Sequence, residues 1–174
     1  MGDARYEVRA LSRRYDLVVH DCFTGGEMPW HLFSVEMVRT LRDRLAADGI
    51  LAVSFYGLLE GREGEALSAV AATLDAEFPH RLTLAPAPGR ELFDRIFLAS
   101  AAALDLPAGP PVRSLSPGGR LAFDALPGMV TAVEGEPGLV VTDDRNPLER
   151  MQLRKGEAYR EWVVGRFGVD LLSR

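Results

Sequence analysis

Asp21 is the residue of this 174-residue chain best placed to do chemistry. It closes an apolar run, residues 15–20 (YDLVVH), and opens a glycine-containing loop that ends at Pro29. A continuous apolar run is typical of a strand buried on both faces of a parallel sheet. Ligands of open α/β sheets bind at the carboxyl ends of such strands. A carboxylate there can act as a general base, or it can simply cap the loop that follows.

Other acidic residues are candidates for binding a cofactor or a cationic substrate. Asp3 and Ala4 precede the first expected helix, where a carboxylate can accept the amine of adenine and alanine leaves room for the ring. Asp3 can equally be a plain helix N-cap. Asp143 and Asp144 can hold a diamine, as can Glu27 in the loop after the first strand. Asp and Asn are also turn residues, so the 143–147 segment has a turn as its alternative interpretation.

The histidines and the cysteine indicate no metal centre. His20 and His31 have no third ligand at metal-binding spacing, so we expect no bound metal. The single cysteine, Cys22, excludes an internal disulfide framework and a cysteine zinc cluster. We expect Cys22 to be a small, buried apolar side chain.

The overall charge and hydropathy narrow the possible partners. The net charge of −5 and the pI near 5.3 argue against nucleic-acid binding, which needs a basic face. A small cationic amine fits an acidic protein better. No apolar stretch reaches the length of a bilayer, and the polar start does not resemble a signal peptide. We therefore expect a cytoplasmic protein without a membrane partner.

The hydrophobic periodicity predicts a single α/β domain with a largely parallel sheet. The last two expected strands lie too close together for a helical crossover, so we expect them to pair antiparallel at one edge of the sheet. The expected helices are residues 5–13, Leu32–Ala47 and Glu65–Phe78, and the expected strands are Leu17–Asp21, Ile50–Tyr56, Arg81–Ala85 and Arg95–Ser100.

Composition divides the chain into three parts. Residues 1–100 carry the α/β pattern, and residues 101–130 are a proline- and glycine-rich connection with one short element at Leu121–Leu126. Residues 131–174 are expected to pack on the same domain. They include a possible short strand at Leu139–Thr142 and a closing helix at Glu157–Leu172.

Together these segments resemble the spermidine synthase-like family of aminopropyltransferases. The resemblance covers most of residues 1–100 and one later patch. It rests on residues 2–5 (GDAR), 15–21 (YDLVVHD), 29–37, 45–51 and 142–149 (TDDRNPLE).

The resemblance implies the C-terminal part of a Rossmann-like methyltransferase sheet that binds S-adenosylmethionine or its decarboxylated form. In that family an aminopropyl group passes to a polyamine, Asp3 would contact adenine, and Asp21 would lie beside the attacking amine. The family usually carries a second aspartate where this chain has Thr24, and its glycine-rich half lies upstream. The alternatives are a non-catalytic remnant that self-associates and a methyltransferase with another acceptor. We expect a homodimer, or another protein, to cover the strand edge that the upstream half would otherwise pair.

Overall fold

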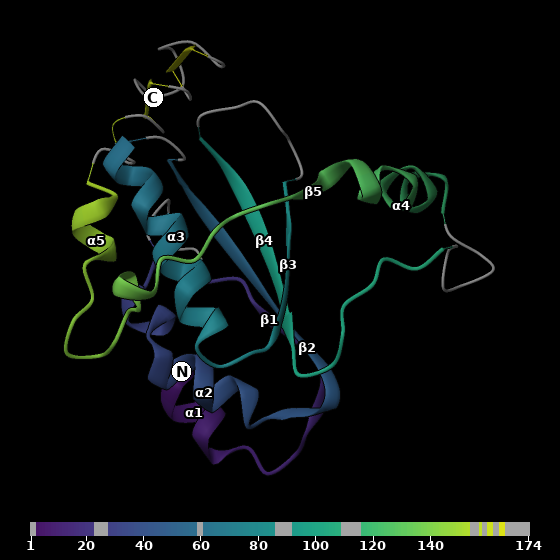
Figure 1. Ribbon diagram of the computed structural model, residues 1–174, viewed down its shortest axis with the longest axis horizontal. Coiled ribbons are helices and arrows are strands. Elements are labelled where there is room, and N and C mark those ends of the chain that lie inside the picture. Colours follow the sequence, from purple (N-terminus) through teal and green to yellow (C-terminus); the bar gives the residue numbers. More distant parts are fainter. Residues whose placement is uncertain are drawn as a thin grey trace, which may run out of the picture.

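The chain folds as one sheet with helices packed against it (Figure 1). The computed structural model describes residues 3–22, 28–58, 61–85, 92–108 and 116–153, and residues 157, 160, 161, 164 and 165 of the tail. The helices are α1 (Ala4–Ala10), α2 (Val35–Arg42), α3 (Gly61–Asp75), α4 (Pro117–Met129) and α5 (Leu148–Met151), with 3₁₀ turns η1 (Trp30–Phe33) and η2 (Pro137–Leu139). The strands are β1 (Tyr15–His20), β2 (Leu45–Leu58), β3 (His80–Leu84), β4 (Leu92–Ser100) and β5 (Val130–Thr131).

The sheet has the strand order β1-β2-β4-β3-β5. β1 and β2 pair in parallel, whereas β4 is antiparallel to both of its neighbours, and β5 is antiparallel to β3. Because β4 opposes β2 and β3 alike, β1, β2 and β3 all run in one direction. The expected α/β class and the antiparallel pairing of the last two long strands are confirmed. The pair does not stand alone at an edge, because β4 is inserted beside β2 and β5 is added beyond β3.

Side chains from one face of the sheet form the core with the helices. In Figure 1, α1, α2, α3 and α5 lie on the same side of the sheet. From β2, Leu51, Val53 and Phe55 are at most 3% exposed and point toward these helices. Phe97 of β4 and Leu74 of α3 are equally buried. Each such side chain contributes about 1.5–3 kcal/mol of burial free energy, so this face determines how the helices pack.

The opposite face of the sheet is less covered, most clearly at β1. Leu17 and Val19 are 56% and 64% exposed, whereas His20, on the other face, is 5% exposed. The buried-on-both-faces interpretation of this apolar run is therefore wrong for β1. Its hydrophobicity reflects an edge strand with one bare face, a difference that strand composition alone does not reveal.

The helix predicted over Leu32–Ala47 is shorter at both ends. Ser34 caps α2 by accepting a hydrogen bond from the Met37 N–H at 3.3 Å, and the residues before it form η1. Leu45 is already paired with Tyr15 in the sheet. The cap at Ser34 and the strand pairing at Leu45 therefore limit α2 to Val35–Arg42.

The C-terminal segment packs on α3 without forming the strand predicted at Leu139–Thr142. Its backbone instead bonds to helices. The Val141 N–H donates to Thr73 Oγ1 at 2.9 Å, and the Val141 carbonyl accepts from the Val35 N–H at 2.8 Å. Val141 and Leu148 are fully buried. Most of the predicted closing helix at Glu157–Leu172 lies outside the described residues.

The connection at residues 101–130 carries more regular structure than its composition indicates. Helix α4 spans most of its second half, begins at a Ser116 cap and has no buried residue. In Figure 1 it projects from the side of the sheet opposite α5. Among the described helices, none combines the length and apolar character needed to cross a bilayer.

Candidate active site at the carboxyl end of β1

Asp21 follows the last residue of β1, and its side chain is exposed. Its neighbour His20 pairs with Val53 of β2, which fixes the end of the parallel ladder. No hydrogen bond or ion pair to another described residue engages the Asp21 carboxylate. The loop at 23–27 lies outside the described residues. It includes Glu27, a predicted substrate contact, and Thr24, which stands where the resembled family usually carries an aspartate. The catalytic role of Asp21 therefore stays a prediction that its position allows.

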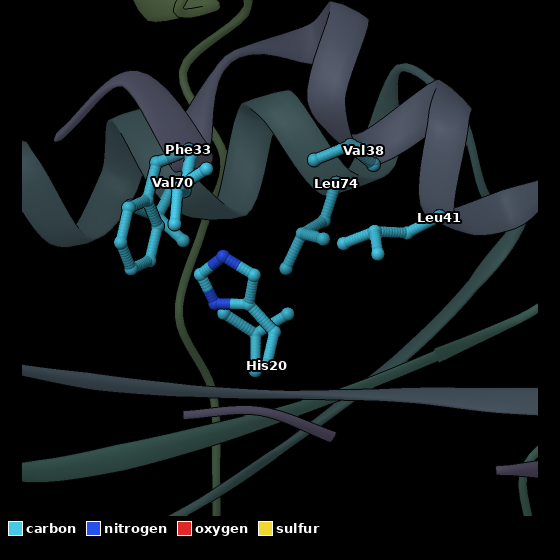
Figure 2. Close-up of a pocket in the computed structure, with 8 residues that line it drawn as sticks. His20, Phe33, Val38, Leu41, Val70 and Leu74 are labelled. Carbon is cyan, nitrogen blue, oxygen red and sulfur yellow. The ribbon is translucent and has the colours of Figure 1, made fainter. Parts of the chain in front are cut away.

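His20, the residue before Asp21, points to the interior among apolar side chains of the helices (Figure 2). Neither ring nitrogen has a hydrogen-bond partner among the described residues. The ring makes an edge-to-face contact with Phe33 at a centroid distance of 4.7 Å. Burial in this apolar setting lowers the pKa of His20 below its usual 6.5, so the imidazole is held neutral.

The cavity that His20 faces is small and almost entirely apolar. Its volume is about 10 Å³, at the lower limit for one water molecule. A buried water needs two to four polar partners, and among the described residues that line the cavity the imidazole is the only polar side chain. The cavity is thus a packing defect next to the candidate site rather than a substrate pocket. Its other lining residues are Leu32, Phe33, Val38, Leu41, Val53, Val70 and Leu74.

Asp3 caps α1, as its N-cap interpretation predicts. One of its carboxylate oxygens also lies close to a histidine. Oδ1 accepts from the backbone N–H groups of Arg5 and Tyr6, at 2.9 and 3.4 Å. Oδ2 lies 3.3 Å from His31 Nε2. Desolvation raises the pKa of Asp3, but the backbone hydrogen bonds and His31 outweigh it and lower the pKa overall. Ala4 is exposed at the first position of the helix.

Asp143 is bound by a cation from within the chain. Arg5 Nη2 donates to both carboxylate oxygens, at 2.6 and 2.7 Å, and also to Ser34 Oγ at 3.0 Å. The Asp143 N–H donates to Glu36 Oε2 at 3.0 Å. Desolvation raises the pKa of Asp143, but the bonds from Arg5 and Ser34 lower it overall. This carboxylate joins α1 and α2 to the C-terminal segment, while Asp144 beside it is exposed.

A larger open cavity, of about 530 Å³, lies between α3, η2 and α5. Its described lining includes three charged side chains, those of Glu65, Arg145 and Arg150, and all three residues are exposed. Glu65 is near the start of α3, which follows the end of β2. Asn146, also in the lining, donates to the Trp30 carbonyl at 2.7 Å. The cavity therefore opens toward the same end of the sheet as Asp21, and its guanidinium groups suit a ligand with an anionic group.

The structure brings only some of the predicted site residues together. Asp3 and Asp143 both contact the α1–α2 region, through His31 and through Arg5 respectively. Neither of the two cavities described above is lined by Asp21. Sequence reasoning missed the arginine-lined cavity, because Arg145 was considered only as part of a turn segment and Arg150 was not singled out. Among the described residues, no group of three or more His, Cys, Asp or Glu could hold a metal ion.

Comparison with known proteins supports the fold most strongly. No family model matches the chain. A curated protein from Emericella nidulans, named N-terminal histidine N-methyltransferase, is 42% identical over 45 residues, which is 26% of this chain and 8% of that protein. MnmC2 from Aquifex aeolicus aligns over 91% of this chain and 44% of its own, with 19% identity and a TM-score of 0.41.

A probable spermidine synthase from Corynebacterium glutamicum superposes on 60% of this chain with a TM-score of 0.52 and 21% sequence identity. The match covers 38% of that protein's own chain, so the present chain corresponds to less than half of it. At this identity the similarity establishes architecture. The described part of the chain has a mixed α/β fold with a five-stranded sheet, and 60% of the chain shares its architecture with that structure.

Proposed function

We propose that this chain belongs to a transferase that uses S-adenosylmethionine or decarboxylated S-adenosylmethionine and passes an aminopropyl group to a polyamine. The observation that carries the proposal is Asp21 at the end of β1, which is exposed and has no hydrogen-bond or ion-pair partner among the described residues, in a fold shared with a probable spermidine synthase. Ligands of such sheets bind at the carboxyl ends of parallel strands.

Asp3 and Ala4 are proposed as the residues that would hold the adenine part of the cofactor. Among the described residues, Asp3 Oδ2 has His31 as its one side-chain partner, at 3.3 Å and with more than half of each side chain exposed. The amine of an adenine ring can take the place of His31 there, because an exposed pair of this kind is weak. Ala4 beside it adds only a methyl group. When bound, the sulfonium group would supply an electrophilic carbon.

Asp21 is suited to the acceptor side of the reaction. A primary ammonium must lose a proton before its nitrogen can attack carbon. An exposed carboxylate can orient the ammonium and take that proton. Holding the amine in line can supply roughly 7–11 kcal/mol of the barrier in favourable cases. Asp144 and Glu27 are proposed as further contacts for the cationic acceptor, and Asp143 would have to exchange Arg5 for it.

The test separates binding from chemistry. Calorimetric titration with methylthioadenosine should give saturable heat with the wild type and weaker binding with Asp3→Asn. With decarboxylated cofactor and putrescine, Asp21→Asn should lower kcat at least about 100-fold, the usual size of a general-base contribution. Asp16→Asn is the matched control, because Asp16 is an exposed carboxylate on the same strand. Equal activity of the Asp21 and Asp16 variants would refute the catalytic assignment.

The second candidate function is a non-catalytic subunit that acts by association. The exposed apolar side chains of β1, at a sheet edge, favour it. Absence of heat with millimolar methylthioadenosine would support this candidate over the transferase. Binding of methylthioadenosine without aminopropyl transfer would instead favour a methyltransferase with another acceptor.

A further inference from the structure

The open cavity between α3, η2 and α5 has the size of a small-molecule pocket. Its volume of about 530 Å³ lies within the range of about 300–1,000 Å³ that is usual for ligand pockets. Asp3, Asp21 and Asp143, the carboxylates considered for the transfer reaction, are not among its described lining residues. That lining instead combines two arginines, one glutamate and several apolar side chains, so the cavity calls for a ligand of its own.

Arg145 and Arg150 give the cavity two guanidinium groups that are not neutralised within the described part of the chain. Neither side chain has a hydrogen-bond or ion-pair partner among the described residues. By contrast, the side chains of Arg5, Arg39 and Arg81 each bind a carboxylate. A planar guanidinium can hold a carboxylate through two parallel N–H···O bonds. The cavity therefore offers both the space and the donors for a carboxylate of a ligand.

The backbone that carries the two arginines is fixed by its own hydrogen bonds and by burial. The Arg145 N–H donates to Thr142 Oγ1, and the Thr142 N–H donates to the Arg145 carbonyl, both at 3.0 Å. Asn146 donates its amide N–H to the Trp30 carbonyl at 2.7 Å and accepts from the Leu148 N–H at 3.3 Å. Leu148 is fully buried at the start of α5. A segment fixed in this way lowers the entropy that a ligand must overcome on binding.

The rest of the described lining narrows the class of ligand. Glu65, an exposed residue of α3, repels a polyanion and suits an ammonium group. Leu139, Val140 and Met151 are half-buried apolar residues, which favour an organic body over an inorganic ion. The two guanidinium groups repel a polyamine, which the proposed function places at Asp21. A small zwitterion with an apolar group meets all of these conditions.

We propose that this cavity binds an α-amino acid with an apolar side chain. Arg145 and Arg150 hold its carboxylate, and Glu65 holds its ammonium group. The apolar lining contacts its side chain. The proposal does not depend on the transfer reaction, because the two sites share no residue and take different ligands.

NMR titration of the isotope-labelled protein tests the ligand class with matched probes. L-Leucine should bind with a Kd below about 1 mM and shift the amide signals of Leu139 and Val140. Two analogues, 3-methylbutylamine without the carboxylate and 4-methylpentanoate without the ammonium group, should bind at least about 10-fold more weakly, since each loses one charged contact. Inorganic phosphate that binds as tightly as leucine, or no saturable shifts with leucine up to about 10 mM, would overturn the proposal.

Substitutions in the cavity test which residue holds which group. Arg145→Gln and Arg150→Gln should each weaken leucine binding at least about 10-fold and leave the affinity for 3-methylbutylamine unchanged, because that amine has no carboxylate to hold. Glu65→Gln should weaken leucine and the amine but not 4-methylpentanoate. Arg120→Gln and Glu134→Gln are the matched controls, since both residues are exposed and neither is in the described lining. Leucine binding that survives all three cavity substitutions, or that falls equally in the controls, would refute the assignment.

Discussion

Arg5 and Asp143 are joined by two hydrogen bonds, of 2.6 and 2.7 Å, although 138 residues separate them in the sequence. The contact attaches the first helix to the segment that follows η2. Arg5 is largely buried at its side chain, with 17% exposed, and Asp143 is 37% exposed. The ion pair therefore connects an early and a late part of the chain. The sequence patterns had indicated a substrate contact for Asp143.

Asp143→Asn should lower the free energy of unfolding by about 1 kcal/mol, because a partly exposed ion pair contributes little more. The folded state lowers the pKa of Asp143. The contribution is thus complete at neutral pH and is lost as the pH falls below the usual value of 3.8. Urea denaturation at several pH values measures this, with the exposed neighbour Asp144→Asn as control. An equal loss in both variants would contradict it.

His20→Leu should stabilise the protein by about 1–3 kcal/mol, since it removes a buried polar ring whose nitrogens have no hydrogen-bond partner in the described part of the chain. Burial lowers the pKa of His20 in the folded state, so below pH 6.5 the unfolded chain binds a proton that the folded chain does not. Wild-type stability should therefore rise with pH up to about 6.5 and then level off. The variant should lose that slope in denaturation curves, whereas His80→Asn, at an exposed site, controls for loss of an imidazole.

Gly49→Ala should destabilise the protein by about 1–3 kcal/mol. An added Cβ would lie 2.8 Å from the Tyr15 carbonyl oxygen and 3.0 Å from the Ala46 nitrogen, and neither backbone atom can move alone. Gly118→Ala is the matched control, because a Cβ there meets nothing within 4 Å. Thermal unfolding should show a lower Tm for the first variant and an unchanged or higher Tm for the second.

Thr73→Val should cost about 1–3 kcal/mol and loosen the C-terminal segment. Thr73 Oγ1 accepts the Val141 N–H, so valine would leave that buried donor without a partner. Thr40→Val is the control, because Thr40 donates only to the Glu36 carbonyl of its own helix. Amide hydrogen exchange should speed up at Val141 in the Thr73 variant alone. Unchanged exchange there would show that the segment is held by other contacts.

The apolar runs predicted the four long strands and the helices between them, because local periodicity follows from burial on one face. The close spacing of the last two long strands also predicted their antiparallel pairing. The spacing could not predict that β4 also pairs with β2, because no local sequence pattern specifies the second neighbour of a strand. A serine shortly before an acidic residue indicates a helix cap at Ser34. The apolar pattern begins before Ser34, however, and therefore predicted a longer helix.

The candidate site was predictable only in part. The strand-end position of Asp21 follows from the run before it, whereas its role in a site stays a prediction. The engagement of Asp143 by Arg5 did not follow, because the chain has 20 basic and 25 acidic residues and no local rule selects one pair across 138 positions. The burial of His20 and the bare face of β1 both depend on which face the helices cover, which single-strand periodicity leaves open.

The placement of β4 has a consequence for how the protein forms during synthesis. β2 and β3 both leave the ribosome before β4, yet each bonds to β4 and not to the other. The nascent chain must keep two strand edges unpaired until residue 100 has emerged. Such non-local pairing slows folding and exposes the chain to aggregation. We therefore expect ribosome-bound chains that end before β4 to be substrates for chaperones, and chains that end after it to be much poorer ones.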